Sequence, residues 1–311
     1  MPMGQAMFAK LLPASLIAVS ACAPADQIPA SIGGERELHS SEIVRFSQEC
    51  EKWDEWDKPA KPFRIHADTY YVGTCGIAAI LIVNDEGHIL IDTGTEKGAD
   101  VVLANIAALG FDPADIGLLL ASHEHFDHVG GMAKVQQVTG GLVVSSEIAI
   151  EVMLSGEDHP DDPQFGVHEP MRPIAHGVPY NDGIGRDVLS AFEITALTTP
   201  GHTPGAMTWS WQSCDGDVCQ TIVYADSLSP VSGDDYKFSD HQTDVALFIE
   251  GLESLVALDC DILLTPHPSH SRMVERAAMG TFLGGMSCAE YANGKMRDLD
   301  ARLEREAGAG Q

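Results

Sequence analysis

The sequence has 311 residues, of which 44% are hydrophobic, and a formal net charge of −28. This length suits one large α/β domain or two small ones, and the hydrophobic share argues against a disordered chain. The acidic charge argues against nucleic acid and against an electrostatic grip on anionic lipid, because both partners need a basic protein surface. The charge instead indicates a well-solvated surface.

The N-terminus carries the features of an export signal. Lys10 precedes an apolar run at residues 11–22, which is too short to span a bilayer and has the small-residue end of a secretory signal. The run ends in VSAC, which resembles a bacterial lipobox. Residues 1–21 are therefore predicted to be removed and Cys22 to become a lipidated first residue, with cleavage after Ala23 as the alternative. Both outcomes export the mature protein, and we expect it in the periplasm.

Residues 22–42 are small and polar without a clear period, and they are predicted to form a flexible tether before a folded domain at residues 43–311. The first elements expected in this domain are a helix over 43–56, strands over 69–72, 77–83 and 88–91, and a helix over 97–109. Asp92 follows the third strand and is expected to hold the turn and not to line a site.

An apolar strand over residues 118–120 leads into a dense group of potential metal ligands. His123, His125, Asp127 and His128 follow within six residues. Residues two apart in an extended segment point to the same side, so His123 and His125 can bind one ion. Asp127 and His128 follow as the chain turns and can face a second ion. A single histidine is more often structural, but this density predicts a hydrolytic site with two metal ions.

Further along, the periodicity predicts a series of shorter elements. They are helices near 132–137 and up to Leu154, strands over 142–144, 191–197, 207–211, 220–225 and 261–264, and helices over 243–257 and 290–305. The last helix is polar enough to lie on the surface. Two halves, each with strands followed by helices, predict two sheets packed face to face with helices outside.

Residues 155–185 form a long segment rich in Asp, Pro and Gly. A loop of this length inside a compact domain is usually functional, and we expect it to fold over the site. Its histidines have no pairing signal and are expected to be ordinary loop residues; they are His159, His168 and His176.

Two further histidines stand in rigid loops directly after strands. His202 lies within TPGHTPG, where proline and glycine on both sides fix the backbone, and His267 lies within TPHP. Five histidines and one aspartate then make two sets of three. Three protein ligands leave one position on zinc open for water, which is the arrangement of catalytic sites. His270 is an alternative to His267 but is expected to be exposed.

Removal of Cys22 would leave six cysteines, an even number that suggests three disulfides in an oxidising compartment. Cys214 and Cys219 bracket the turn sequence DGD between two strand-like runs and are expected to pair across a hairpin. Fifteen connectivities are possible for six cysteines. The shortest pairings left are Cys50 with Cys75 and Cys260 with Cys288.

Taken together, HxHxDH, TPGHTPG and LLTPHP resemble the metallo-β-lactamase superfamily. The segments TYYVGTCGIAAILI, IDTG, YADSLSPVS and CDILLTPHP are most similar to subclass B3. The resemblance spans residues 69–267 and implies a four-layer αββα sandwich with two zinc ions between the sheet edges. It implies His123, His125 and His202 as ligands of the first zinc. It implies Asp127, His128 and His267 as ligands of the second, with no cysteine or carboxylate bridging the metals.

The implied activity is hydrolysis of the β-lactam amide bond of penicillins, cephalosporins and carbapenems, which gives antibiotic resistance. Two zinc ions can share a hydroxide formed near neutral pH, and Asp127 is expected to orient it. The resemblance places Ser227 near the second zinc and Ser229 on the substrate carboxylate, and Tyr236 is a further candidate to reach the carbonyl oxygen. The only expected partners are the small β-lactam substrate and a lipid anchor in the membrane, and the protein is expected to be a monomer.

Asp226 leaves an alternative open. Related lactone and thioester hydrolases have a bridging aspartate after a similar strand, so an Asp226 that reaches both metals would favour a quorum-quenching lactonase or a glyoxalase-II-like enzyme. The flanking SLSPVS, the export signal and the cysteine pattern favour the β-lactamase. A non-enzymatic zinc-binding lipoprotein is a third possibility, against which the open three-ligand sets argue.

Overall fold

The computed structural model describes residues 30–309, with side chains at residues 39–308. The predicted signal peptide, lipobox and Cys22 lie outside the described residues. Helix α1 (Ala30–Glu49) begins inside the segment predicted to be a tether, so the irregular backbone expected there is wrong from Ala30 onward. The helix expected over residues 43–56 also ends earlier, at Glu49. Its second half is held by tertiary packing, because the Phe46 ring contacts Phe63 and Tyr71 with centroids 5.3 Å and 4.9 Å away.

Two sheets form the centre of the molecule. The seven-stranded sheet consists, in spatial order, of β1 (Phe63–His66), β2 (Thr69–Tyr71), β3 (Ile80–Ile82), β4 (His88–Ile91), β5 (Ile116–Leu120), β6 (Leu142–Ser145) and β7 (Gly177–Pro179). The four-stranded sheet has the order β11 (Ile262–Leu264), β10 (Val218–Tyr224), β9 (Met207–Asp215) and β8 (Thr195–Thr198). Strands β1 to β4 pair antiparallel, whereas β4 to β7 pair parallel.

The alternation of side chains along β5 shows how the layers form. Leu118 and Leu120 face the four-stranded sheet and share a core with Trp209 and Tyr224. Leu119 points to the opposite face, where the helices pack. Each strand residue therefore belongs to one of two cores according to its parity. Because the ligand-rich segment follows β5 directly, its position is fixed by both cores.

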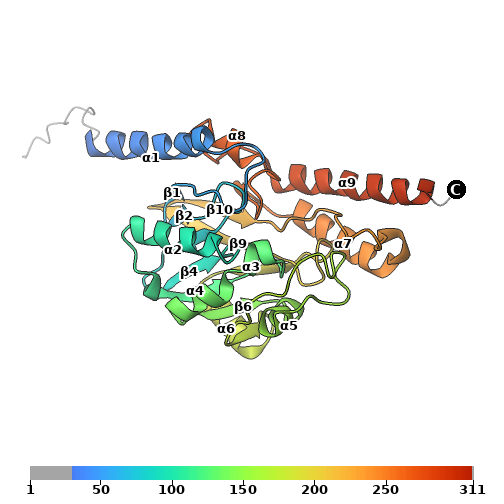
Figure 1. Cartoon of the computed structure of the whole chain (residues 1–311). Coiled ribbons are helices and arrows are strands. Elements are labelled where there is room, and N and C mark those ends of the chain that lie inside the picture. Colours follow the sequence, from blue (N-terminus) through green and yellow to red (C-terminus); the bar gives the residue numbers. More distant parts are fainter. Residues whose placement is uncertain (1–29, 310–311) are drawn as a thin grey trace, which may run out of the picture.

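Helices cover the outer face of each sheet (Figure 1). The seven-stranded sheet is covered by α2 (Gly98–Ala108), α4 (Met132–Thr139) and α5 (Glu147–Ser155), while α7 (Gln242–Val256) and α9 (Cys288–Ala309) cover the four-stranded sheet. The remaining helices are short: α3 (Phe126–Val129), α6 (Gly183–Ala191), α8 (Met273–Ala277) and two 3-10 turns at Pro113–Asp115 and Phe238–Asp240. The four-layer αββα sandwich is thus confirmed.

Several elements differ from the sequence-based expectations. Strand β1 was not expected, although Phe63 and Ile65 alternate inward with two less buried residues. The strand expected over residues 191–197 begins only at Thr195, because α6 runs to Ala191 and a turn follows it. This helix is capped at its start by the Asp182 side chain, which accepts a hydrogen bond from Gly185 N. Helix α8 was also not expected. Helix α9, expected on the surface, buries one face against α7 and β10.

The structure brings together the three cysteine pairs Cys50–Cys75, Cys214–Cys219 and Cys260–Cys288. Cys214 and Cys219 stand opposite each other across the β9–β10 hairpin. The pair Cys50–Cys75 ties the end of α1 to the loop between β2 and β3. The pair Cys260–Cys288 ties the start of β11 to the start of α9.

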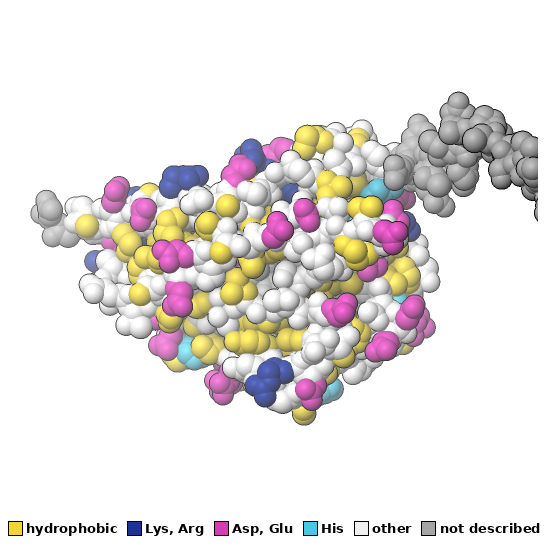
Figure 2. Space-filling view, turned by 180° about the vertical axis from the view of Figure 1, so that it is seen from behind, with side chains coloured by type: hydrophobic (Ala, Val, Ile, Leu, Met, Phe, Trp, Pro, Cys, Tyr) yellow, Lys and Arg dark blue, Asp and Glu magenta, His cyan; other side chains and the backbone are white. Residues whose placement is uncertain are grey.

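Acidic side chains are scattered over the face shown in Figure 2 and are not gathered into one patch, which fits a solvated surface. Within residues 30–309, none of the helices combines the length and the apolar character that crossing a membrane requires.

Candidate metal centre

The ligand-rich segment after β5 enters the site as the sequence predicted. His123 is fully buried, and His125 and Asp127 are buried at less than one tenth exposure. The segment is anchored by Asp92, whose Oδ1 accepts a 2.7 Å hydrogen bond from Ser122 N and whose Oδ2 accepts one of 2.7 Å from Ser122 Oγ. Asp92 therefore anchors the segment that carries the histidines and not its own turn, which differs from the expectation.

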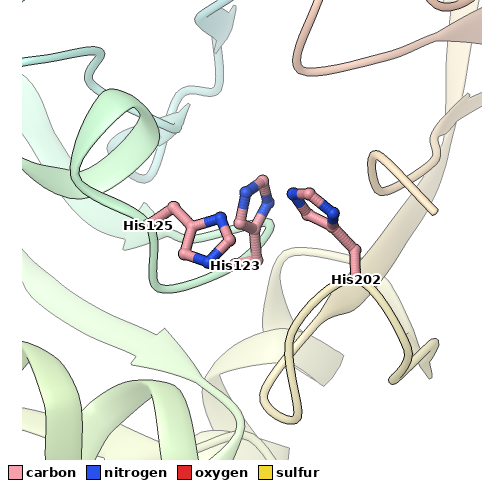
Figure 3. A group of neighbouring side chains, drawn as sticks. All are labelled: His123, His125 and His202. Carbon is pink, nitrogen blue, oxygen red and sulfur yellow. The ribbon is translucent and has the colours of Figure 1, made fainter. Parts of the chain in front are cut away.

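Three histidine rings converge on one point. His123, His125 and His202 point toward one another from two different loops (Figure 3). Each pair of rings has centroids 4.9 Å apart and planes crossing at 81° to 84°. One ring nitrogen of each histidine lies within 4.8 Å of the others, so the three can serve as ligands of one ion.

Each of these rings is oriented through its other nitrogen. His123 Nδ1 lies 3.2 Å from its hydrogen-bond partner Ser122 Oγ and, without hydrogen-bond geometry, 2.8 Å from Asp226 Oδ1. His125 Nε2 lies 3.0 Å from Asp162 Oδ2, and His202 Nδ1 lies 2.9 Å from the Ser229 carbonyl oxygen. A partner on one nitrogen fixes the tautomer and leaves the second nitrogen for a metal. Consistent with this, His123 Nε2 is buried and has no hydrogen-bond partner. Burial lowers the pKa of His123 and His202 well below the usual value, so both rings are neutral ligands at pH 7.

The second set also converges. Asp127 Oδ2 lies 3.1 Å from His128 Nε2 and 3.3 Å from His267 Nε2, and the two nitrogens are 3.2 Å apart. Ligand atoms at about 2.0–2.1 Å from a tetrahedral zinc ion are separated by about 3.3 Å, so the spacing fits such an ion. Burial alone would raise the pKa of Asp127, but the charges and hydrogen bonds of His128 and His267 lower it well below the usual range. The carboxylate is therefore ionised, as a ligand must be.

Both sets open into a cavity of about 820 Å³. His125, Asp127, His202 and His267 line it, together with residues of the loop after α5, of the segment after α1 and of α9. The residues present thus fit metal ions with an open side toward a small-molecule cavity, as in catalytic metal sites.

The long loop reaches the site, as expected. Asp162 from this loop is 5% exposed and contacts His125, and Gln164 and His168 line the cavity. His168 packs on the Phe126 ring with centroids 4.2 Å apart and belongs to neither ligand set. His159 and His176 do not line the cavity.

Of the other residues predicted for the site, some line the cavity and others do not. Ser229 lines the cavity, whereas Ser227 is fully buried beneath it and its Oγ has no hydrogen-bond partner. Tyr236 does not line the cavity; its ring stacks on His241 with centroids 4.3 Å apart, so the expected contact with a carbonyl oxygen is not supported. His270 is half-buried beside His267, not exposed, but it does not join the second set.

Glu124, between two ligands, has a role that the sequence analysis missed. Because alternate residues of an extended segment face opposite sides, its side chain points away from the ligand side. Its carboxylate accepts hydrogen bonds from Thr203 Oγ1 at 2.9 Å and from Gly205 N at 2.8 Å. It thereby joins the loop that carries His202 to the segment that carries His123. Its position in the sequence between His123 and His125 is the feature that could have predicted this role.

Comparison with known proteins agrees with this geometry. Residues 72–267 match the Metallo-beta-lactamase superfamily, and the chain belongs to this family. It is similar to the solved structure of the MIM-2 metallo-β-lactamase, with 45% identity, a TM-score of 0.77, and coverage of 85% of this chain and 98% of that one. It is also similar to MEM-A1, a subclass B3 metallo-β-lactamase from a soil metagenome library, with 33% identity, a TM-score of 0.72 and coverage of 82% and 100%. The resemblance to subclass B3 is thereby confirmed.

A more distant relative has a different activity. Ribonuclease TTHA0252 of Thermus thermophilus is 29% identical over 161 residues, which are 49% of this chain. The match spans only 35% of that ribonuclease. The superfamily membership therefore does not by itself decide the substrate.

Proposed function

We propose that the protein hydrolyses the β-lactam amide bond of penicillins, cephalosporins and carbapenems and so gives antibiotic resistance. The observation that carries this proposal is the pair of three-residue sets, of which two members each line one open cavity together with Ser229. Support comes from the metallo-β-lactamases of solved structure, one of which is 45% identical over nearly its whole length.

The residues suit zinc ions, one held by His123, His125 and His202 and the other by Asp127, His128 and His267. Bound there, zinc would lower the pKa of water and polarise a carbonyl oxygen. In hydrolysis the water oxygen joins the carbonyl carbon, the carbon–nitrogen bond breaks and the nitrogen takes a proton. Asp127 lines the cavity, where its ionised carboxylate can orient the attacking water by accepting a hydrogen bond from it.

Asp226 bears on the alternative of a lactone or thioester hydrolase. Its carboxylate is fully buried, with Oδ1 against His123 Nδ1 and Oδ2 accepting a hydrogen bond from Leu228 N at 3.2 Å. It belongs to neither ligand set and supports one ligand from behind. This position favours the β-lactamase over enzymes with a bridging aspartate. The net charge of −28 likewise argues against the nuclease activity of the distant relative.

The test is turnover by purified, zinc-loaded protein. Penicillin, cephalosporin and carbapenem substrates are assayed beside an acyl-homoserine lactone and a glutathione thioester. We expect lactam hydrolysis that disappears with a chelator and in His202→Ala. His176→Ala is the control, since His176 is exposed and outside the cavity. Lactone or thioester turnover without lactam turnover would overturn the proposal, and no turnover at all would favour a zinc-binding lipoprotein.

We also propose export to the periplasm and anchoring through a lipid on Cys22, supported by the VSAC sequence that ends there. Cys22→Ala is expected to move the protein from the membrane fraction to the soluble periplasmic fraction. An unchanged distribution would refute the anchor.

A further inference from the structure

The loop that carries His267 runs from the end of β11 to the start of α8, and one side chain joins its two ends. Arg276 on α8 donates a 2.7 Å hydrogen bond from Nη1 to the carbonyl oxygen of Leu263. The same nitrogen lies 3.4 Å from the carbonyl oxygen of Ser271. Leu263 precedes the loop and Ser271 stands near its end, so the guanidinium group closes the base of the loop.

Inside the loop, a short network of hydrogen bonds fixes the backbone around His267. Thr265 Oγ1 donates to the carbonyl oxygen of His267 at 2.8 Å and lies 2.8 Å from Ser271 Oγ. From the other sheet, Ala78 N donates a 2.7 Å hydrogen bond to the carbonyl oxygen of Pro266. Because the backbone is held on both sides of His267, a shift of either end of the loop would move its ring.

The carbonyl oxygen of Leu263 depends on Arg276 for a partner. Strand β11 is at the edge of the four-stranded sheet and pairs only with β10. The Leu264 carbonyl oxygen accepts from Ala225 N and therefore points toward β10. Successive carbonyl groups of a strand point to opposite sides, so that of Leu263 points away from the sheet, where an edge strand has no ladder partner. Arg276 supplies the donor at this position.

Arg276 is itself held firmly in the core. The residue is 4% exposed. Among the residues with described side chains, no carboxylate oxygen lies within 4.0 Å of its guanidinium nitrogens. The group instead lies over the Phe282 ring, with its carbon 5.2 Å from the centroid, and Nη2 donates to the Phe282 carbonyl oxygen at 3.1 Å. Met273 and Ala277 of the same helix are fully buried in the core between the sheets. Helix α8 is therefore a fixed support for the loop.

We propose that Arg276 is a positioning residue for the second metal ion. By closing the loop, it keeps His267 Nε2 at the 3.3 Å from Asp127 Oδ2 and the 3.2 Å from His128 Nε2 that a shared ion requires. The ligands of the first ion stand elsewhere, on the segment after β5 and in the loop after β8. Arg276 therefore acts on one of the two metal ions. This role goes beyond the proposed lactam hydrolysis, because it does not depend on the substrate.

A contribution to stability alone is the competing explanation. The two roles differ in their effect on the two metal ions. A general loss of stability has no reason to weaken one metal ion more than the other. Loss of a positioning contact weakens the second ion and leaves the first ion as it was.

The experiment measures zinc affinity of the metal-free protein in two backgrounds, by titration in competition with a chromophoric chelator. His202→Ala removes a ligand of the first set, so the remaining binding reports the second set; His267→Ala does the reverse. Arg276→Met is added to each background. We expect it to lower zinc affinity about 10- to 100-fold in the His202→Ala background, as for the loss of support behind a ligand, and not at all in the His267→Ala background.

Ile106→Ala is the control for stability. Ile106 is fully buried on α2, beneath the outer face of the seven-stranded sheet. This change should lower the unfolding midpoint but leave zinc affinity unchanged in both backgrounds, at a temperature at which circular dichroism shows every variant folded. If Arg276→Met does not fold, Arg276→Lys replaces it. Lysine keeps the charge but lacks the planar fork that reaches two carbonyl groups, so the same selective loss is expected.

Unchanged zinc affinity of the second set, an equal loss in both backgrounds, or the same loss in Ile106→Ala would overturn the proposal. A His202→Ala protein that binds no zinc would refute the second set and this proposal with it. Zinc binding is measured without substrate, so a failure of the proposed lactam hydrolysis would be seen separately and would leave this test intact.

Discussion

Replacement of Asp162 by Asn gives a quantitative test of how the metal site is held. Asp162 Oδ2 lies 3.0 Å from His125 Nε2 and fixes the ring with its other nitrogen toward His123 and His202. Asn keeps the shape but removes the charge that raises the basicity of the ring. Loss of such a supporting partner costs about 10- to 100-fold in metal affinity, which is about 1.4–2.7 kcal/mol. We expect this loss at the three-histidine set.

The measurement is a zinc titration of the metal-free protein in competition with a chromophoric chelator. Asp161→Asn is the matched control. It removes the same charge from the neighbouring residue, whose side chain is 78% exposed. The control should bind zinc as the wild type does. Equal zinc affinities of Asp162→Asn and Asp161→Asn would show that the carboxylate does not support His125 and would refute the reasoning.

Three further changes test the parts that surround the ligands. Gly205→Ala places a Cβ 2.5 Å from the carboxylate of Glu124 and should lower the unfolding free energy in denaturant titrations by about 1–3 kcal/mol. Gly117→Ala is the control and should not lower it, because the space around Gly117 is open. Equal effects of the two changes would contradict this prediction. Burial raises the pKa of Glu124 from 4.5 to about 7. The contribution of Glu124 to the unfolding free energy of the metal-free protein should therefore be fully present below pH 4.5 and be lost, by about 3 kcal/mol, as the pH rises through 7. Glu124→Gln should remove that fall, and an unchanged pH profile of chemical denaturation would refute the assignment. Replacing Cys50 and Cys75 together by serine should lower the unfolding free energy by about 2–4 kcal/mol, and an unchanged unfolding midpoint would count against this.

The side chains of the two proposed ligand sets could be predicted because they stand in recognisable local sequence patterns. His123 to His128 form a dense group after an apolar strand, and His202 sits in a loop whose backbone is fixed by its own prolines and glycines. Asp162 and Arg276 could not be found in this way. Each is a single charged residue without a local pattern, and only its tertiary contacts give it a role.

In the fold, too, elements with a clear local sequence pattern were predictable, and elements that depend on tertiary contacts were not. Strands with strong apolar runs, such as β5, were expected correctly, since burial on both faces leaves a clear pattern. Helix α6 contains two glycines and reads as loop, and α1 has a polar first half; both depend on a cap or on tertiary packing. The inner face of α9 was missed because Tyr291 and Lys295 are polar side chains that are buried by their hydrogen-bond partners.

The cavity draws its walls from nearly the whole folded chain, from Lys52 after the first helix to Arg305 in the last. A ribosome that has just passed His267, three residues after β11, has therefore produced all six proposed metal ligands but no part of α9. A chain cut before α9 would keep the ligand residues and lose Tyr291 and Lys295, whose hydrogen bonds hold Ser227 and Ser229 in place. Completion of the binding surface must accordingly wait for the final helix, so a carboxyl-terminal deletion should be judged as an active-site change.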